Sequence, residues 1–242
     1  MKTRADLLLV ERGLFESRAK AREAIEAGLV TANGTPVRKP SDTIAHDAQI
    51  EAQAPYPWVS RGGLKLVAGL DHFRIDPAGL VCLDVGSSTG GFTHVLLARG
   101  AAKVFAVDVG QDQLHGSLRG DPRVVSLEKT DAREIDGNLI PQKPELIVCD
   151  ASFISLKLVL PCALELAAAG ARLVALVKPQ FEAGRAAAKK GIVKDAAIHA
   201  AVCSEIDGWL ASTGWNVLGL TPSPITGGDG NVEFLIAAEK AT

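Results

Sequence analysis

Four charged residues stand beside apolar runs, where a folded sheet would bring them to one rim. Asp150 and Lys178 each follow such a run, and Glu233 precedes one. Lys65 lies on a predicted helix ahead of the sheet, within SRGGLKL. Each alone has an ordinary explanation, since Lys65 could be a surface lysine and Glu233 an edge-strand acid. Two lysines and two acids at one rim are instead a set that can take up and release a proton.

A glycine-rich loop, DVGSSTGG at residues 84–91, follows the first apolar run. Gly86 and Gly90 allow the backbone to turn sharply and to approach a ligand closely. The next run ends in Asp108, 22 residues after Gly86, where an acid can accept both hydroxyls of a ribose. This spacing by itself also fits a dinucleotide-dependent dehydrogenase.

Two details favour S-adenosylmethionine as the ligand. The loop reads GSSTGG and not GxGxxG, so the tight helix start that binds pyrophosphate is missing. Asp84 precedes the loop, where a carboxylate could hold a cationic amino group. Asp131 could accept the adenine amino group or cap a helix at AREID, and the sequence leaves both open. The predicted cofactor contacts are Asp84, Gly86, Ser87, Gly90, Asp108 and Asp131.

Apolar runs and helical stretches alternate from residue 80 onward, which predicts a doubly wound, mostly parallel sheet. Two strands at the end of the chain suggest an antiparallel edge. Helices are predicted at 91–100, 158–170 and 196–213, and Leu64, Val67 and Ala68 are expected to face inward on the helix of Lys65. The predicted strands are 80–86, 103–110, 124–131, 144–150, 171–179, 216–224 and 232–240.

Residues 1–54 predict a separate, small α+β domain. A helix at 4–13 precedes a second at 18–28, which Ser17 caps, and a hairpin turns at Asn33-Gly34. Residues 55–60, PYPWVS, read as a stiff linker to the domain at 61–242. The linker tryptophan, Trp58, could stack on RNA, but packing against one domain is the preferred interpretation.

Basic residues gather locally although the formal net charge is −2. Residues 1–40 hold eight Lys or Arg against five acids, and residues 178–194 hold five against one. Such patches suit RNA phosphates, although charge alone fits a solvated helix face or a surface loop equally well. The predicted RNA-binding residues are Arg4, Arg18, Lys20, Arg22, Arg38, Lys39, Arg61, Arg185, Lys189 and Lys190.

The composition, 47% hydrophobic and 22% charged, is that of a soluble globular protein. The N-terminus has only four consecutive apolar residues before a charge, which does not make a signal peptide. The most apolar region, 156–177, is interrupted by charges and a proline. Four cysteines without a CxxC pair indicate buried thiols. We expect a cytoplasmic protein with no membrane span and no metal.

The segment RADLLLVERGLFESRAKAREAIEAGLVTANGTPVRKPSDTI closely resembles the small RNA-binding domain first known in ribosomal protein S-four. The shared features are the Leu-rich first helix, the pattern SRxxAxxxIxxGxV and the hairpin NGxxVxKPS. The resemblance implies docking on structured RNA, largely through shape and backbone contacts.

The wider chain, from about residue 3 to residue 239, resembles the TlyA-type, or haemolysin A, rRNA methyltransferases, which belong to the FtsJ-like class. The matching text is SRGGLKL, LDVGSSTGGFTHVLL, AVDVG, CDASFISL, LVKPQFE, GIVKD and GGDGNVEFL. The resemblance implies a Rossmann-like class I methyltransferase fold that uses S-adenosylmethionine. It also implies ribose 2′-O-methylation of a cytidine in 16S or 23S rRNA, with rRNA or ribosomal subunits as partners, by a tetrad of Lys65, Asp150, Lys178 and Glu233.

The implied chemistry suits these residue types. A ribose hydroxyl must lose its proton as it attacks a sulfonium methyl group. Lys178, beside a second cation, could be uncharged often enough to accept that proton, with Asp150 orienting it. Lys65 would stabilise the developing oxyanion, and Glu233 would hold Lys65 or the ribose. The sequence does not decide which lysine has which task.

Three other functions fit less of the sequence. A membrane-active haemolysin would need a span or a strongly amphipathic basic helix. An inactive RNA-binding assembly factor would not need the four charged residues, and an NAD-linked dehydrogenase would need another loop. The text CDASF also lacks the two prolines typical of methylation at planar amines. The target nucleotide, the preferred ribosomal subunit and the choice between monomer and weak dimer stay open.

Overall fold

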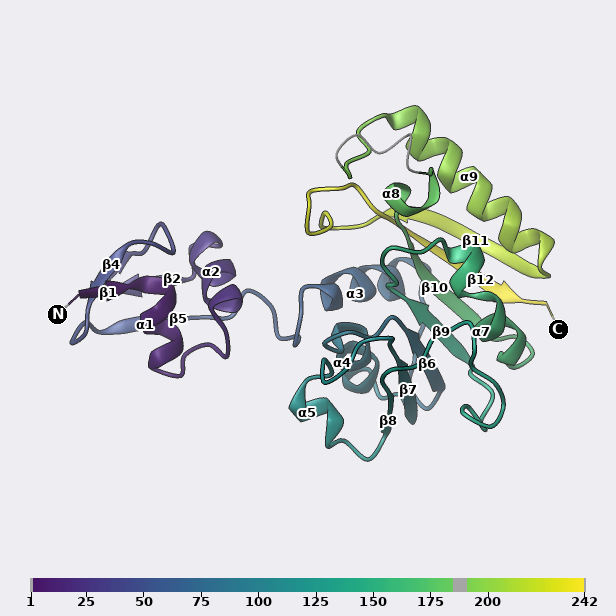
Figure 1. Cartoon of the computed structure of the whole chain (residues 1–242), viewed down its shortest axis with the longest axis horizontal. Helices are drawn as coiled ribbons and strands as arrows, with labels where there is room; N and C mark the ends of the chain where they lie inside the picture. The colour runs from purple at the N-terminus through teal and green to yellow at the C-terminus, as the bar shows by residue number, and fades with distance from the viewer. Residues whose placement is uncertain (1, 185–190, 242) are drawn as a thin grey trace. The chain divides into compact units, whose positions relative to one another are not determined.

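The computed structural model describes residues 2–184 and 191–241. The chain divides into two compact units, residues 1–57 and residues 58–242 (Figure 1). Each has a hydrophobic core of its own.

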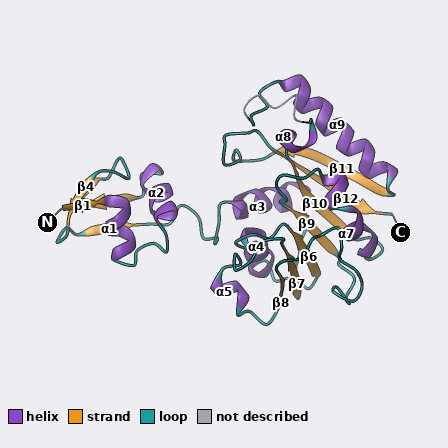
Figure 2. Cartoon of the chain, in the orientation of Figure 1, coloured by secondary structure: helices purple, strands orange, loops and turns teal. Residues whose placement is uncertain are grey.

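The N-terminal unit combines two short helices with short antiparallel strands (Figure 2). Ser17 accepts a hydrogen bond from the backbone N–H of Lys20, as expected of a helix cap. Asn33 and Gly34 both have positive φ, so the predicted hairpin turn is confirmed. The elements are β1 (Lys2–Arg4), α1 (Ala5–Glu11), α2 (Arg18–Glu26), β2 (Val30–Ala32), β3 (Thr35–Pro36), β4 (Thr43–Ala45) and β5 (Ile50–Ala52).

One carboxylate is buried in this unit. Asp6 is inaccessible to solvent and pairs with two guanidinium groups, those of Arg4 at 3.0 Å and Arg18 at 2.9 Å. The hydrogen bond from Arg4 is the main reason that the pKa of Asp6 falls from 3.8 to about 2. The ion pairs thereby attach β1 and α2 to the first turn of α1.

The second unit is a seven-stranded sheet in the order β11-β12-β10-β9-β6-β7-β8. The five strands from β10 to β8 are parallel, as the alternating pattern predicts. The antiparallel edge is also confirmed, because β12 runs against both β10 and β11. The strands are β6 (Val81–Val85), β7 (Lys103–Val107), β8 (Val124–Leu127), β9 (Leu146–Cys149), β10 (Arg172–Val177), β11 (Trp215–Pro222) and β12 (Phe234–Lys240).

Helices cover both faces of the sheet (Figure 2). One face packs against α6 (Leu156–Val159), α7 (Pro161–Leu166) and α9 (Ala196–Ser212). The other packs against α3 (Gly62–Phe73), α4 (Gly91–Ala98) and α5 (Gly116–Arg119). A one-turn helix, α8 (Pro179–Glu182), follows β10. Both faces are therefore apolar, and polar chemistry is confined to the strand ends.

One local prediction was wrong, and a second was only partly right, since Val67 and Ala68 pack against the core as predicted. The helix predicted at 158–170 is two helices, because Pro161 lacks an N–H and begins α7. On α3, the fully buried apolar side chains are Leu66 and Leu70, while Leu64, Val67 and Ala68 are only half-buried. The buried stripe of α3 also contains Lys65, which amphipathic patterning assigns to solvent.

Trp58 packs within the second unit. Its indole contacts the ring of His94 edge-on at 5.3 Å and lies against Gly63, where a Cβ would come within 2.4 Å of Trp58 Cγ. The packing interpretation of Trp58 is therefore the better one. Cys82 and Cys149 are buried as predicted, and burial raises the pKa of each thiol to about 12.

Replacing Asp6 tests the buried ion pairs. Because the pKa of Asp6 is lower in the folded state, its contribution to stability is present above about pH 4 and is lost as the pH falls through about 2. Asp6→Asn should therefore destabilise the N-terminal unit at pH 7, and the difference from wild type should shrink towards pH 2. Hydrogen exchange of residues 2–52 measures this. Asp47→Asn, an exposed aspartate of the same unit, is the control, and a difference that stays constant with pH would contradict the prediction.

Candidate active site

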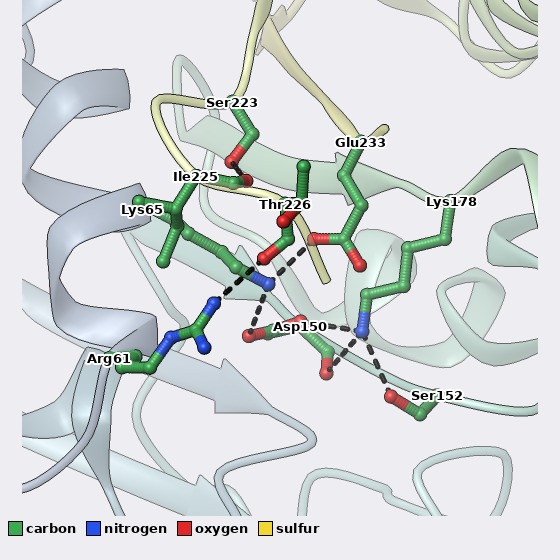
Figure 3. A network of polar contacts seen from close by, with 9 residues as sticks. All are labelled: Arg61, Lys65, Asp150, Ser152, Lys178, Ser223, Ile225, Thr226 and Glu233. Carbon is green, nitrogen blue, oxygen red and sulfur yellow. Dashed lines mark hydrogen bonds and ion pairs between the residues drawn. The ribbon is translucent and has the colours of Figure 1, made fainter. Parts of the chain in front are cut away.

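The sheet topology brings the four charged residues together. Asp150 and Lys178 follow the parallel neighbours β9 and β10, so both emerge at the same edge of the sheet. Val177 pairs with Phe234, which places Glu233 beside Lys178 at that edge. Lys65 reaches the edge from the second turn of α3. Segments 168 residues apart in the chain, at Lys65 and Glu233, thus form one cluster (Figure 3).

Asp150 lies between the two lysines. Its Oδ1 is 2.6 Å from Lys178 Nζ, and its Oδ2 is 3.9 Å from Lys65 Nζ. Lys65 Nζ also donates to Glu233 Oε2 at 2.6 Å. The result is a chain of alternating charge, Lys178–Asp150–Lys65–Glu233, in which Asp150 bridges the two cations (Figure 3).

The cluster is largely removed from water. Lys65, Lys178 and Glu233 are only 7%, 6% and 3% exposed, whereas the Asp150 side chain is 21% exposed. Charges in such a place must be paired, because removing one partner of a buried pair costs about 3–5 kcal/mol. Asp150 is the member of the cluster that is most accessible to solvent.

Ser152 was not identified from the sequence. Lys178 Nζ donates to Ser152 Oγ at 2.9 Å and lies 3.4 Å from the backbone oxygen of Asp150 (Figure 3). The available signal was the position of Ser152, two residues beyond Asp150 in the same loop. Serine is common in loops, so this signal is weak.

A loop over the cluster, residues 223–231, closes the side of Glu233. Arg61 donates to the backbone oxygen of Thr226 at 3.0 Å, so this predicted RNA-binding residue holds the loop (Figure 3). Gly227 lies against the carboxylate, since a Cβ there would be 2.5 Å from Glu233 Oε1. The absence of a side chain at Gly227 thus allows Glu233 to reach Lys65.

A cavity of about 490 Å³ adjoins the cluster at the carboxyl ends of the parallel strands. Of the predicted cofactor residues, Gly86, Asp108 and Asp131 line it, and so do Asp150 and Ser152. Its remaining walls are mainly apolar and include Val107, Ala132, Ile154 and Val159.

Asp84, Ser87 and Gly90 are not part of that lining. Asp84 is inaccessible to solvent and accepts a hydrogen bond from the Thr93 hydroxyl at 2.6 Å. Its other oxygen, Oδ1, has no hydrogen-bond partner among the described residues. Burial raises the pKa of Asp84 to about 7. Gly90 adopts a φ of 92° and packs against Leu118, with no room for a Cβ.

The two predicted cofactor-binding acids that line the cavity are held differently. Asp108 accepts the backbone N–H groups of Ser88 at 2.8 Å and Gly110 at 2.7 Å, one on each oxygen. Asp131 accepts the backbone N–H of Arg133 and pairs with its guanidinium, which lowers the pKa of Asp131 to about 2. No helix begins at AREID, so Asp131 does not cap a helix. It precedes a turn instead.

The predicted RNA-binding residues of the N-terminal unit fall into two groups. Arg4 and Arg18 pair with Asp6, and Lys20 pairs with Glu16. The others, Arg22, Arg38 and Lys39, are exposed. Three more, Arg185, Lys189 and Lys190, lie outside the described residues. In the described part of the chain, no group of three His, Cys, Asp or Glu side chains is placed to hold a metal ion, and no helix there is long and apolar enough to cross a membrane.

Comparison with known proteins gives the family. The model of FtsJ-like methyltransferases matches residues 58–240, three quarters of the chain, and the model of the S4 domain matches residues 3–50. The chain belongs to the FtsJ-like methyltransferase family.

Relatives place this methyltransferase within the TlyA type. It is 47% identical to YqxC of Bacillus subtilis, with 97% of this chain and 85% of that protein covered. It is 46% identical to the 16S/23S rRNA (cytidine-2′-O)-methyltransferase TlyA of Mycobacterium tuberculosis, with 97% and 89% covered.

Solved structures agree with this placement. A protein of Streptococcus thermophilus described as a hemolysin has a TM-score of 0.79 and 42% identity, with 99% of this methyltransferase and 89% of that chain covered. A protein of Listeria monocytogenes described as an S-adenosylmethionine-dependent methyltransferase shares the fold, with a TM-score of 0.55 at 15% identity, covering 74% and 100%.

Substituting Gly227 should displace Glu233. Because φ at Gly227 is not positive, alanine fits the backbone there, and only the clash with Glu233 Oε1 opposes it. We expect Gly227→Ala to lower the free energy of unfolding by about 1–3 kcal/mol, the usual cost of overpacking. Chemical denaturation measures the change. Gly228→Ala is the matched control, since nothing lies within 4 Å of its Cβ position. Equal denaturation midpoints for the two variants would contradict the prediction.

Proposed function

We propose that the protein methylates the ribose 2′-hydroxyl of a cytidine in ribosomal RNA, with S-adenosylmethionine as the methyl donor. The observation that carries the proposal is the position of Asp150, which contacts both buried lysines and also lines the adjoining cavity. The names of the TlyA relatives supply the nucleotide and the class of RNA. A ribosomal RNA substrate supports a cytoplasmic location for the protein.

The cavity residues fit S-adenosylmethionine by their chemistry. A volume of about 490 Å³ lies within the range of about 300–1,000 Å³ typical of small-molecule sites. Each oxygen of Asp108 has accepted one backbone N–H and can accept one more hydrogen bond, which suits the two hydroxyls of a ribose. Asp131 suits an amino group, and Val107, Ile154 and Val159 suit an adenine face. The bound cofactor supplies an electrophilic methyl group on a sulfonium.

The cluster supplies the proton chemistry. Lys178, in its uncharged form, accepts the proton of the 2′-hydroxyl as the oxygen attacks, and Asp150 and Ser152 fix its position. Lys65, which is paired with Glu233 at 2.6 Å, stabilises the negative charge that develops on the oxygen. This assigns the two lysines to different tasks because they have different partners.

The remaining polar surface suits RNA. In the N-terminal unit, Arg22, Arg38 and Lys39 are exposed, and Arg4, Arg18 and Lys20 keep part of their side chains in solvent. Arg61, Arg185, Lys189 and Lys190 complete the proposed phosphate contacts. Phe153 is 90% exposed at the cavity, where a nucleobase can stack on its ring. We assign recognition to residues 1–54 and catalysis to 61–242, with the linker 55–60 between them, of which Trp58 and Val59 pack in the core of the second unit.

The other candidate functions gain no support. A haemolysin would act on a membrane, and no helix in the described residues could span one. An inactive assembly factor has no use for four paired charges of which three are buried, because such burial is costly.

Removing the Asp108 carboxylate should weaken cofactor binding. Asp108→Ala loses the ribose acceptor and frees two backbone N–H groups, so the affinity for S-adenosylmethionine should fall by about 1–3 kcal/mol. Isothermal titration calorimetry measures it. Asp112→Ala removes the same charge at an exposed site of the following loop and should bind normally. Unchanged affinity in Asp108→Ala would mean that the adenosine binds elsewhere.

Replacing Lys178 with arginine distinguishes a general base from a residue that supplies only positive charge. Arginine, with a pKa above about 12, keeps the charge but cannot take up the proton. Lys178→Arg should therefore reduce single-turnover methyl transfer at saturating RNA by at least about a hundredfold, with RNA and cofactor binding close to normal. The substrate is rRNA from cells that lack the protein, and 2′-O-methyl positions are mapped on the product.

Lys194→Arg, an exposed residue, is the control for this exchange and should be tolerated. Substantial transfer by Lys178→Arg would reassign the base to Lys65 or to solvent. If the wild-type protein adds no 2′-O-methyl group to either 16S or 23S rRNA, the proposed function itself is wrong.

A further inference from the structure

The loop over the cluster, residues 223–231, ends just before Glu233 at a buried amide, the side chain of Asn231. Asn231 lies two residues before Glu233 and is only 2% exposed, while Val232 between them is exposed. A primary amide at this depth costs free energy unless both its donor and its acceptor are satisfied. The hydrogen-bond partners of the Asn231 amide therefore indicate its structural role.

The amide of Asn231 binds a separate segment of the chain. Its Oδ1 accepts the backbone N–H of Val193 at 3.0 Å, and its Nδ2 donates to the backbone oxygen of Gly191 at 2.9 Å. The side chain thus pairs with the segment 191–193 as a neighbouring strand would, through one donor and one acceptor. A primary amide offers a separate donor and acceptor for these two partners, whereas an aspartate at this position could not donate to Gly191.

The backbone of Asn231 contacts Gly227, the residue that packs against the Glu233 carboxylate. Its oxygen accepts the N–H of Gly227 at 2.9 Å, and Gly227 is the residue that packs against Glu233 Oε1. The backbone of residue 231 therefore holds in place the surface on which the carboxylate rests. The orientation of that carboxylate towards Lys65 depends on this surface.

The segment to which Asn231 is tied is itself anchored. The ring of His199 hydrogen-bonds the backbone oxygen of Val193 at 2.9 Å and lies edge-on to Phe234 at 5.7 Å. His199 stands on α9, whose Val202 and Ile206 are buried in the core. A series of contacts thus connects the core to Glu233. It passes through α9, Val193 and Asn231.

We propose that Asn231 is a positioning residue of the methyl-transfer reaction, which holds Glu233 against Lys65 without touching either substrate. The inference rests on the proposed function, but its structural part concerns the Lys65–Glu233 pair and can be tested without RNA. Loss of the tie should let Glu233 move, and a shift of about 1 Å in a catalytic group can cost about a hundredfold in rate.

The first measurement is the chemical reactivity of the lysines. Trace labelling of the full-length protein with acetic anhydride, read by mass spectrometry, should modify Lys65 several times faster in Asn231→Asp than in wild type. Lys178, which is paired with Asp150, serves as the internal reference and should not change. Asp229→Asn, an exposed side chain of the same loop, is the control and should label as wild type does.

The second measurement is a double-mutant cycle with Glu233→Gln, in single turnover at saturating RNA and cofactor. If Asn231 acts through Glu233, Asn231→Asp should lower the rate about a hundredfold and should lower it little further in the Glu233→Gln background. Cofactor affinity should stay within about twofold of wild type. Effects that multiply in the double variant, or unchanged labelling of Lys65, would overturn the proposal.

Folding is checked by circular dichroism at the assay temperature. If Asn231→Asp does not fold, Asn231→Ser replaces it, since serine is small and polar but cannot span both partners. A wild-type protein that transfers no methyl group would refute the proposed function, whereas the labelling result would still decide whether Asn231 holds Glu233.

Discussion

The bridging of two buried lysines by Asp150 is the constraint on which the rest of the site depends. Two ammonium groups close together repel each other, and removing them from water adds a further cost. One carboxylate between them, with Glu233 beyond Lys65, gives every charge an opposite neighbour. The arrangement thus holds two cations near each other without leaving any charge unpaired.

The order of the strands makes this bridging possible. Parallel β9 and β10 end at the same edge, so Asp150 and Lys178 meet without any special loop. Glu233 joins them because β12 runs the other way and therefore begins where β10 ends. A fully parallel sheet would have placed the start of that strand at the opposite edge. The antiparallel edge thus also determines which residues form the charged cluster.

Prediction from sequence succeeded where a residue follows from the end of an apolar run. Asp108, Asp150 and Lys178 were placed in this way, because a strand end fixes the edge at which a side chain emerges. Lys65 had a weaker local signal, since a lysine within an amphipathic helix is normally expected in solvent, and its role came from the family resemblance. Asn231 and Gly227 could not be found at all, because their roles depend on contacts between loops distant in the sequence. No local pattern records such contacts.

Burial also separates acids that the sequence presents as equivalent. Asp84 and Asp108 both stand at the carboxyl ends of central strands, and each could be assigned to a ligand. Asp84, however, is inaccessible and bonded to Thr93, and its pKa of about 7 shows how strongly its surroundings oppose a charge. Asp108 faces the cavity, and two backbone N–H groups fix its orientation. An acid in the first situation helps to define the shape of the loop, whereas one in the second can bind a ligand. The difference lies in exposure to the cavity, which the position of a residue along a strand does not reveal.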